Sequence, residues 1–168
     1  MEASNLKLRR LASSAVLAAL YASLTVALAG ISYGEVQFRI AEALCVLPFF
    51  LPETAWGLFV GCIIANIVGG NGLPDIVFGS LSTLLACFIT SKIRIKWLAP
   101  LPPVLINAAA VGAMLAMLYY PAELFWESFG ICALSVGFGE AVVCYGLGLP
   151  LILVLERTKI MRKIWPGQ

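Results

Sequence analysis

Long apolar stretches run through this chain and decide what it can fold into. Hydrophobic residues make up 61% of its 168 residues, charged residues only 12%, and the mean hydropathy is +0.98. One soluble core of this size could not bury so many apolar side chains. About 20 apolar residues of helix cross a hydrocarbon layer of roughly 30 Å. We therefore predict an all-α integral membrane protein with a single membrane domain.

Proline, glycine and charged residues divide the apolar sequence into six predicted helices that form a transmembrane bundle. The second helix is short for a span, so we expect it to be tilted, irregular or sheltered by its neighbours. Pro150 lies inside the last helix and predicts a kink there. The six helices are predicted over residues 11–31, 40–51, 54–68, 76–91, 97–119 and 125–155.

Basic residues favour an even number of spans. With a cytoplasmic N-terminus and six spans, ten of the eleven Lys and Arg residues fall on the inner side, as the positive-inside rule requires. Arg39 is the exception. We therefore predict a multi-pass plasma-membrane protein with both termini in the cytoplasm. A cleaved signal peptide is the alternative for the first helix, but residues 11–31 exceed the usual apolar length of such a peptide.

Catalytic motifs are missing from the sequence. The chain has no histidine, which excludes an HExxH zinc site and a histidine-based triad. It has no GxxxxGK[ST] loop, so we do not expect it to hydrolyse ATP. Its five cysteines stand singly in apolar segments and do not have the spacing of metal ligands. We expect a protein that is not an enzyme and has no metal or cofactor of its own.

Several polar residues are predicted to lie within the apolar layer, where an ionisable group costs roughly 2.5–3.5 kcal/mol at mid-bilayer. Their positions in the predicted helices allow them to meet in one pocket in the outer half of the bundle. The alternatives are that Arg39 and Glu42, three residues apart, pair on one helix face, and that the asparagines join neighbouring helices. The residues are Arg39, Glu42, Asn66, Asp75, Asn107 and Glu140.

Acidic residues outnumber basic ones in the predicted outer half, where Arg39 is the only basic residue. This excess would attract a cation. Carboxylates accept paired hydrogen bonds and amides both donate and accept them, so the residues suit a flat heterocycle with an N–H edge. Tyr33 and Phe38 could stack on such a ring.

Five stretches of the chain resemble the QueT family, the substrate-binding S components of energy-coupling factor (ECF) vitamin transporters. The resemblance implies a six-helix protein that captures a queuosine precursor, such as preQ1 or queuine, which are 7-deazaguanines. It also implies a transmembrane coupling protein and two cytoplasmic ATPases that use ATP, with no nucleic acid as a partner. The stretches are ISYGEVQFRIAEAL (31–44), LPFFLPE (47–53), GLPDIVFGSLSTLLA (72–86), KWLAPLPPVLINA (96–108) and GEAVVCYGLGLPLILVLE (139–156).

A 7-deazaguanine with an amine substituent fits the polar residues. We predict Glu42 and Glu140 as its two carboxylate partners, without assigning which of them takes the ring edge. Arg39 either donates to the ring carbonyl or holds Glu42 in place, and Asp75 is a weaker candidate because we expect water to reach it. The remaining predicted binding residues are Asn107, Gln37, Tyr33, Phe38 and Asn66.

The first helix carries two pairs of alanines at small-xxx-small spacing, Ala15 with Ala19 and Ala18 with Ala22. Such pairs permit close approach of another helix. S components that resemble this chain use alanines of this spacing to meet the coupling protein, so we predict that role here. The alternative is packing inside the bundle.

Two other functions remain open at this point. An ion-coupled secondary carrier for a small cationic heterocycle would also bind its ligand at membrane depth, although such carriers usually show internal repeats. An intramembrane enzyme would need a nucleophile or a metal beside Glu42 and Glu140, and the sequence suggests neither.

Overall fold

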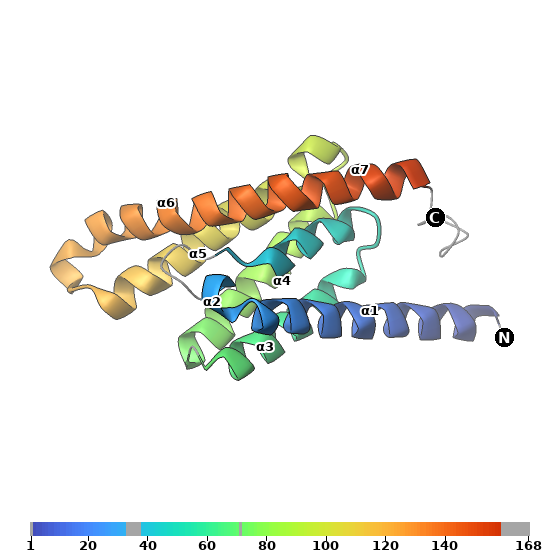
Figure 1. The fold of residues 1–168 in the computed structure, drawn as a ribbon, viewed down its shortest axis with the longest axis horizontal. Coiled ribbons are helices and arrows are strands. Elements are labelled where there is room, and N and C mark those ends of the chain that lie inside the picture. Colours follow the sequence, from blue (N-terminus) through green and yellow to red (C-terminus); the bar gives the residue numbers. More distant parts are fainter. Residues whose placement is uncertain (1, 33–37, 71, 159–168) are drawn as a thin grey trace.

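The computed structural model describes residues 2–32, 38–70 and 72–158, with side chains described from residue 8 onward (Figure 1). Helices make up most of this part of the chain, and no strand occurs in it. The predicted all-α class is confirmed.

Twelve helical elements follow one another along the described residues. The first half contains α1 (Glu2–Ala27), α2 (Ala29–Ser32), the 3-10 helix η1 (Ile40–Phe49), α3 (Thr54–Gly69), the π-helical turn η2 (Asp75–Gly79) and α4 (Ser80–Thr90). The second half contains the 3-10 turn η3 (Lys96–Leu98), α5 (Leu101–Tyr119), the 3-10 turn η4 (Ala122–Leu124), α6 (Phe125–Val143), the π-helical turn η5 (Cys144–Gly148) and α7 (Leu149–Thr158).

Proline and glycine explain where α5 begins and where α3 ends. Pro102 and Pro103 lie in the first turn of α5, where a missing N–H removes no helical hydrogen bond. Gly70 ends α3 in the left-handed conformation with φ of 70°, and its N–H donates to the carbonyl of Ile67. These signals limit the helices to ranges close to the predicted ones.

Three helical stretches of the described chain are long and apolar enough to cross a membrane: Leu8–Ala27, Lys96–Tyr119 and Ala122–Thr158. The third contains α6, η5 and α7, which run on as one long helix (Figure 1). The other apolar helices, Ile40–Phe49, Thr54–Gly69 and Asp75–Thr90, are shorter. A membrane protein with six spans would therefore need its shorter helices to cross the bilayer as well.

The short helix η1 lies inside the bundle, as expected for a short second helix sheltered by its neighbours. It packs against α1, α3, α4, α6, η5 and α7, and seven of its ten residues are buried. Gly148 of η5 allows part of this contact, because a Cβ there would lie 2.8 Å from Val46 Cγ1. The neighbouring helices thus take the place of lipid around η1.

Two π-helical turns interrupt the helices, at Asp75–Gly79 and at Cys144–Gly148. The second turn lies just before Pro150, which lacks the N–H that a regular helix needs at that position. The long helix passes through Pro150 with this wider turn in front of it. Such turns are frequent at functional sites, and both border the polar residues described below.

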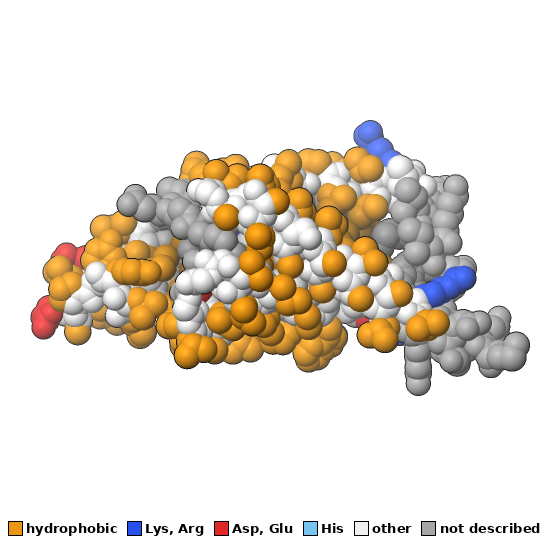
Figure 2. All heavy atoms as spheres, turned by 60° about the horizontal axis from the view of Figure 1, so that its bottom comes forward, with side chains coloured by type: hydrophobic (Ala, Val, Ile, Leu, Met, Phe, Trp, Pro, Cys, Tyr) orange, Lys and Arg blue, Asp and Glu red, His pale blue; other side chains and the backbone are white. Residues whose placement is uncertain are grey.

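Exposed charged side chains on the face drawn in Figure 2 lie toward the two ends of the molecule. On the face drawn in Figure 2, Lys and Arg side chains appear at the end where α1 begins and α7 ends in Figure 1, and acidic side chains appear at the opposite tip. That tip contains η4 and the start of α6, where Glu123 and Glu127 are exposed. The surface between the ends is mostly apolar (Figure 2), as expected for a protein surrounded by lipid.

Glycine allows α1 to pack closely along α3. A Cβ at Gly57 would lie 2.3 Å from the backbone oxygen of Ser14, a distance that no real structure tolerates. We expect Gly57→Ala to lower the free energy of unfolding by about 2–3 kcal/mol, because the helices must move apart. Thermal melting in detergent measures the effect. Gly130→Ala is the control, because nothing lies within 4 Å of its Cβ; equal melting temperatures for the two variants would contradict this packing.

Candidate functional site

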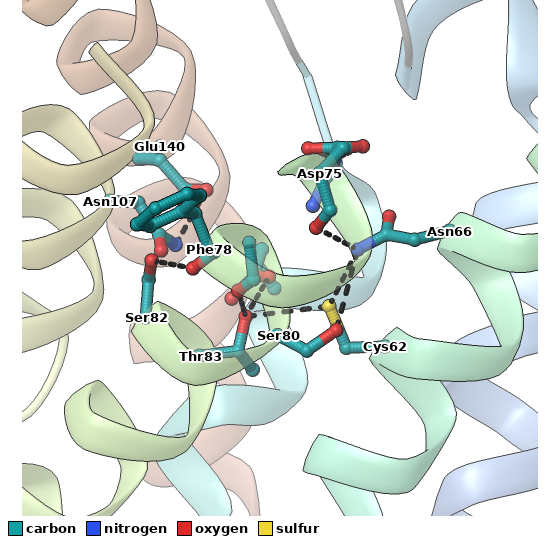
Figure 3. A network of polar contacts seen from close by, with 12 residues as sticks. Cys62, Asn66, Asp75, Phe78, Ser80, Ser82, Thr83, Asn107 and Glu140 are labelled. Atoms are coloured by element: carbon teal, nitrogen blue, oxygen red, sulfur yellow. Dashed lines mark hydrogen bonds and ion pairs between the residues drawn. The ribbon is translucent and has the colours of Figure 1, made fainter. Parts of the chain in front are cut away.

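Buried polar side chains from helices far apart in the sequence gather in the middle of the bundle (Figure 3). In this view Asn107 and Glu140 lie on one side, Asp75 and Asn66 on the other, and Thr83 between them. We call the group on one side the ion-pair cluster (Arg39, Asp75 and Asn66) and the group on the other the acid cluster (Glu42, Glu140, Asn107 and Cys144).

In the ion-pair cluster, Arg39 and Asp75 form a buried salt bridge. Arg39 Nη2 donates to both carboxylate oxygens of Asp75, at 3.2 and 3.0 Å, and each residue is only 4% exposed. Asn66 Nδ2 donates to the backbone oxygen of Asp75 at 2.9 Å. Gly79 makes room for the three side chains, because a Cβ there would lie 3.2 Å from Asn66 Nδ2 and Asp75 Oδ1.

Glu42 of η1 is completely buried and receives hydrogen bonds from three residues. The hydroxyl of Tyr21 and the hydroxyl of Thr83, at 3.0 Å, donate to its Oε1. The thiol of Cys45 donates to Oε2 at 3.0 Å. The carboxylate therefore connects α1 and α4 to η1.

Glu140 of α6 faces Asn107 of α5. Asn107 Nδ2 donates to Glu140 Oε1 at 2.9 Å, and the Cys144 thiol lies 3.6 Å from Glu140 Oε2. This contact turns the NH₂ group of the Asn107 amide toward Glu140 and the amide oxygen away from it. That oxygen, Asn107 Oδ1, is buried and receives no hydrogen bond from the described residues.

The two carboxylates differ in their remaining capacity to accept hydrogen bonds. An ionised carboxylate has about four acceptor positions. Three donors already occupy those of Glu42, whereas Glu140 has one amide donor and one distant thiol. Glu140 and the oxygen of Asn107 therefore form the part of the cluster best able to receive N–H groups from a ligand.

Cys144 connects the two carboxylate-bearing helices. Its Sγ lies 3.7 Å from the backbone oxygen of Glu42 and 3.6 Å from Glu140 Oε2. The helices that carry the two predicted acids, η1 and α6, are thus in contact. No group of three His, Cys, Asp or Glu side chains suited to a metal ion occurs in the part of the chain that the structure describes.

The ion-pair cluster corrects two expectations about individual residues. Arg39 forms its salt bridge with Asp75 of η2 and not with Glu42. Glu42 instead accepts from Tyr21 and Thr83 on other helices and from Cys45 on its own helix. Asp75 is 4% exposed, so the expectation that water reaches it is wrong.

The predicted aromatic residues are only partly described. Phe38 lies against Phe138 of α6, with ring centroids 6.3 Å apart and an edge-to-face arrangement. This contact brings Phe38 to the helix that carries Glu140. Tyr33 and Gln37 lie outside the described residues.

The alanines of α1 divide into two faces. Ala18 and Ala22 are buried, and Ala18 lies on the side of α3, where a Cβ at Gly61 would be 2.7 Å from the Ala18 oxygen. Ala15 and Ala19 are exposed. The pair Ala18 and Ala22 is therefore covered by this chain, and Ala15 and Ala19 remain accessible to another protein.

Four residues of the acid cluster and its surroundings were not predicted from the sequence: Tyr21, Cys45, Thr83 and Cys144. Hydroxyls and thiols are common in apolar helices, where they bond to their own backbone, so their presence gives no signal. Tyr21 gives a weak signal, because a buried tyrosine hydroxyl usually has a hydrogen-bond partner.

Comparisons with known proteins place this chain in a family. Residues 11–157 match the family model described as QueT transporter. The queuosine precursor transporter QueT of Lactococcus lactis subsp. cremoris (strain MG1363) is 40% identical over 73 residues. This alignment covers 42% of the present chain and 43% of the relative, so the chain spans less than half of that relative's length in the match. No solved structure matches the chain.

Proposed function

Because this chain belongs to the QueT transporter family, we propose that it is the substrate-capture (S) component of an ECF importer for a queuosine precursor. The proposed ligand is a 7-deazaguanine that carries a protonated amine, such as preQ1 or queuine. The printed name of the Lactococcus lactis relative, a queuosine precursor transporter, supports this substrate class.

The observation that carries the proposal is the pairing of Glu140 with Asn107 in the middle of the bundle. Glu140 has acceptor positions left, and Asn107 Oδ1 is a buried acceptor without a donor among the described residues. A buried polar atom without a partner costs free energy, which a ligand donor would recover. A 7-deazaguanine offers both an N–H edge and an ammonium group to such acceptors.

Charge supports the same ligand class. The buried salt bridge matches Arg39 with Asp75. Among the described residues, no Lys or Arg forms an ion pair with Glu42 or Glu140. Buried charges are normally paired, so a cationic ligand would compensate for these carboxylates better than a neutral one.

We further propose six membrane-spanning segments, with both termini in the cytoplasm of the plasma membrane. The basic end of the molecule, where α1 begins and α7 ends, suits the cytoplasmic side (Figure 2). The acidic tip then lies outside. In this orientation the short helix η1 is shielded from lipid by its neighbours.

The partners in this proposal are a transmembrane coupling protein and two cytoplasmic ATPases, which use ATP. The exposed alanines Ala15 and Ala19 of α1 form the proposed contact with the coupling protein. Small residues at this spacing let a partner helix approach closely.

Binding of the purified chain in detergent tests the ligand, with preQ1, queuine and guanine titrated separately by calorimetry. We expect both amine-bearing ligands to bind at least about tenfold more tightly than guanine, because a hydrogen bond to a charged group contributes about 1.5–3 kcal/mol. Equal binding of guanine, or no binding of any of the three, would contradict the proposed ligand. Uptake by the chain alone, driven by an ion gradient, would favour a secondary carrier instead.

A further inference from the structure

Tyr21 is the largest completely buried side chain of the described residues, and its hydroxyl donates to Glu42 Oε1. It belongs to α1, a helix that contributes no residue to the proposed ligand contacts. A tyrosine hydroxyl buried among apolar side chains needs a partner, and here that partner is a carboxylate of the acid cluster.

Close packing holds the Tyr21 side chain in place. A Cβ at Gly61 of α3 would lie 2.9 Å from Tyr21 Cβ, so glycine is needed where the two helices meet. Thr25 Oγ1 donates to the backbone oxygen of Tyr21 at 2.9 Å, one turn further along α1. The hydroxyl is therefore aimed at Glu42 by the α1–α3 contact and does not depend on a ligand.

The hydrogen bonds to Glu42 compensate for the water that its carboxylate loses on burial. Tyr21 and Thr83 share Oε1, and Cys45 bonds to Oε2. Several hydrogen bonds to one carboxylate fix the direction in which it points. The Cys144 thiol lies between the backbone oxygen of Glu42 and Glu140 Oε2. The Glu42 carboxylate is thus held on a helix, η1, that packs against the helix of Glu140.

We propose that Tyr21 is a positioning residue which, by holding the Glu42 carboxylate beside Glu140, makes the ligand site selective for a cation. The inference rests on the function proposed above. Glu140 contacts the ligand, whereas Glu42 adds to the negative field that the ligand's ammonium group compensates. Without the Tyr21 hydroxyl, Glu42 keeps only Thr83 on Oε1 and Cys45 on Oε2, so its direction is fixed less firmly.

The substitution Tyr21→Phe tests this role, because phenylalanine keeps the ring that packs against α3. The probes are preQ1 and its 7-cyano counterpart, which has the same ring system and no cationic group. We expect Tyr21→Phe to weaken preQ1 binding about tenfold and to change binding of the cyano compound less than twofold. Tyr119→Phe, at an exposed tyrosine, is the control and should change neither affinity.

A double-mutant cycle tests whether Tyr21 acts through Glu42. In the Glu42→Gln background, adding Tyr21→Phe should leave the ratio of the two affinities unchanged, because the charge has already been removed. An equal loss of both ligands in Tyr21→Phe would indicate a packing role and overturn the proposal. The proposal would also be overturned if Tyr21→Phe changed neither affinity. It would likewise be overturned if adding Tyr21→Phe to Glu42→Gln changed the ratio of the preQ1 affinity to that of the cyano compound further.

The same titrations distinguish this inference from the function on which it rests. If the unmodified chain binds neither preQ1 nor the cyano compound, the proposed function fails and the inference fails with it. If the unmodified chain prefers preQ1 and Tyr21→Phe keeps that preference, only the role of Tyr21 is overturned.

Discussion

Arg39→Met is expected to destabilise this protein by about 3–5 kcal/mol, because it leaves the buried carboxylate of Asp75 without its cation. The two residues are each 4% exposed, and their atoms approach to 3.0 Å. At this depth water compensates little for the loss of the attraction. Thermal melting and denaturant titration in detergent measure the loss.

A double variant tests the electrostatic origin of that loss. Arg39→Met combined with Asp75→Leu replaces both charges by apolar groups, which is often neutral for a buried pair, so most of the stability should return. The matched control is Lys96→Gln, which breaks the exposed salt bridge of Lys96 with Glu156, where the side chains are 37% and 54% exposed. Exposed pairs contribute about 0–1 kcal/mol. If Arg39→Met melted like Lys96→Gln, the ion pair would not have the importance that its burial indicates.

The positions of the helices could be predicted from the sequence wherever apolar runs end at strong local signals. The predicted helix over residues 54–68 corresponds to α3 (Thr54–Gly69), because Pro52 precedes it and Gly70 ends it in a left-handed conformation. The first helix was predicted from residue 11, whereas α1 begins at Glu2. Hydropathy reports the part of a helix that can lie in lipid, and a helix can continue beyond that part.

The candidate site could be predicted as a set of residues but not as a set of contacts. Arg39, Glu42, Asn107 and Glu140 stand out because polar residues are costly in apolar segments. Which of them meet depends on how each helix is rotated about its axis, and hydropathy does not fix that rotation. A local rule therefore suggested a pair three residues apart, while the structure joins Arg39 to Asp75 on another helix.

The π-helical turns explain part of what the sequence could not predict. Asp75 lies at the start of one turn, and Cys144 lies at the start of the other, next to the helix that carries Glu140. A π-helical turn changes the direction in which the following side chains point relative to a regular helix. An assignment of faces from regular helical spacing is therefore unreliable on either side of these turns.

Glu140→Gln is expected to weaken binding of preQ1 about 100-fold, the largest loss that we predict for ligand binding. The variant keeps an oxygen that can accept from Asn107 Nδ2, so the contact between α5 and α6 is retained. It removes the negative charge that we propose to pair with the ligand's cation. Breaking a buried charge pair costs about 2–5 kcal/mol. A loss of about 2.7 kcal/mol corresponds to a 100-fold change in affinity. Calorimetric titration measures it.

The pattern of losses across ligands and variants identifies what Glu140 does. If Glu140 meets the cation, Glu140→Gln should weaken preQ1 far more than guanine, and its melting temperature without ligand should stay close to that of the unmodified chain. Glu127→Gln, in the exposed first turn of the same helix, should leave both affinities within about twofold. A large loss of preQ1 affinity in Glu127→Gln, with none in Glu140→Gln, would indicate that the ligand binds at the acidic tip of the molecule. Because Glu42 already has three donors and Glu140 does not, the geometry favours Glu140.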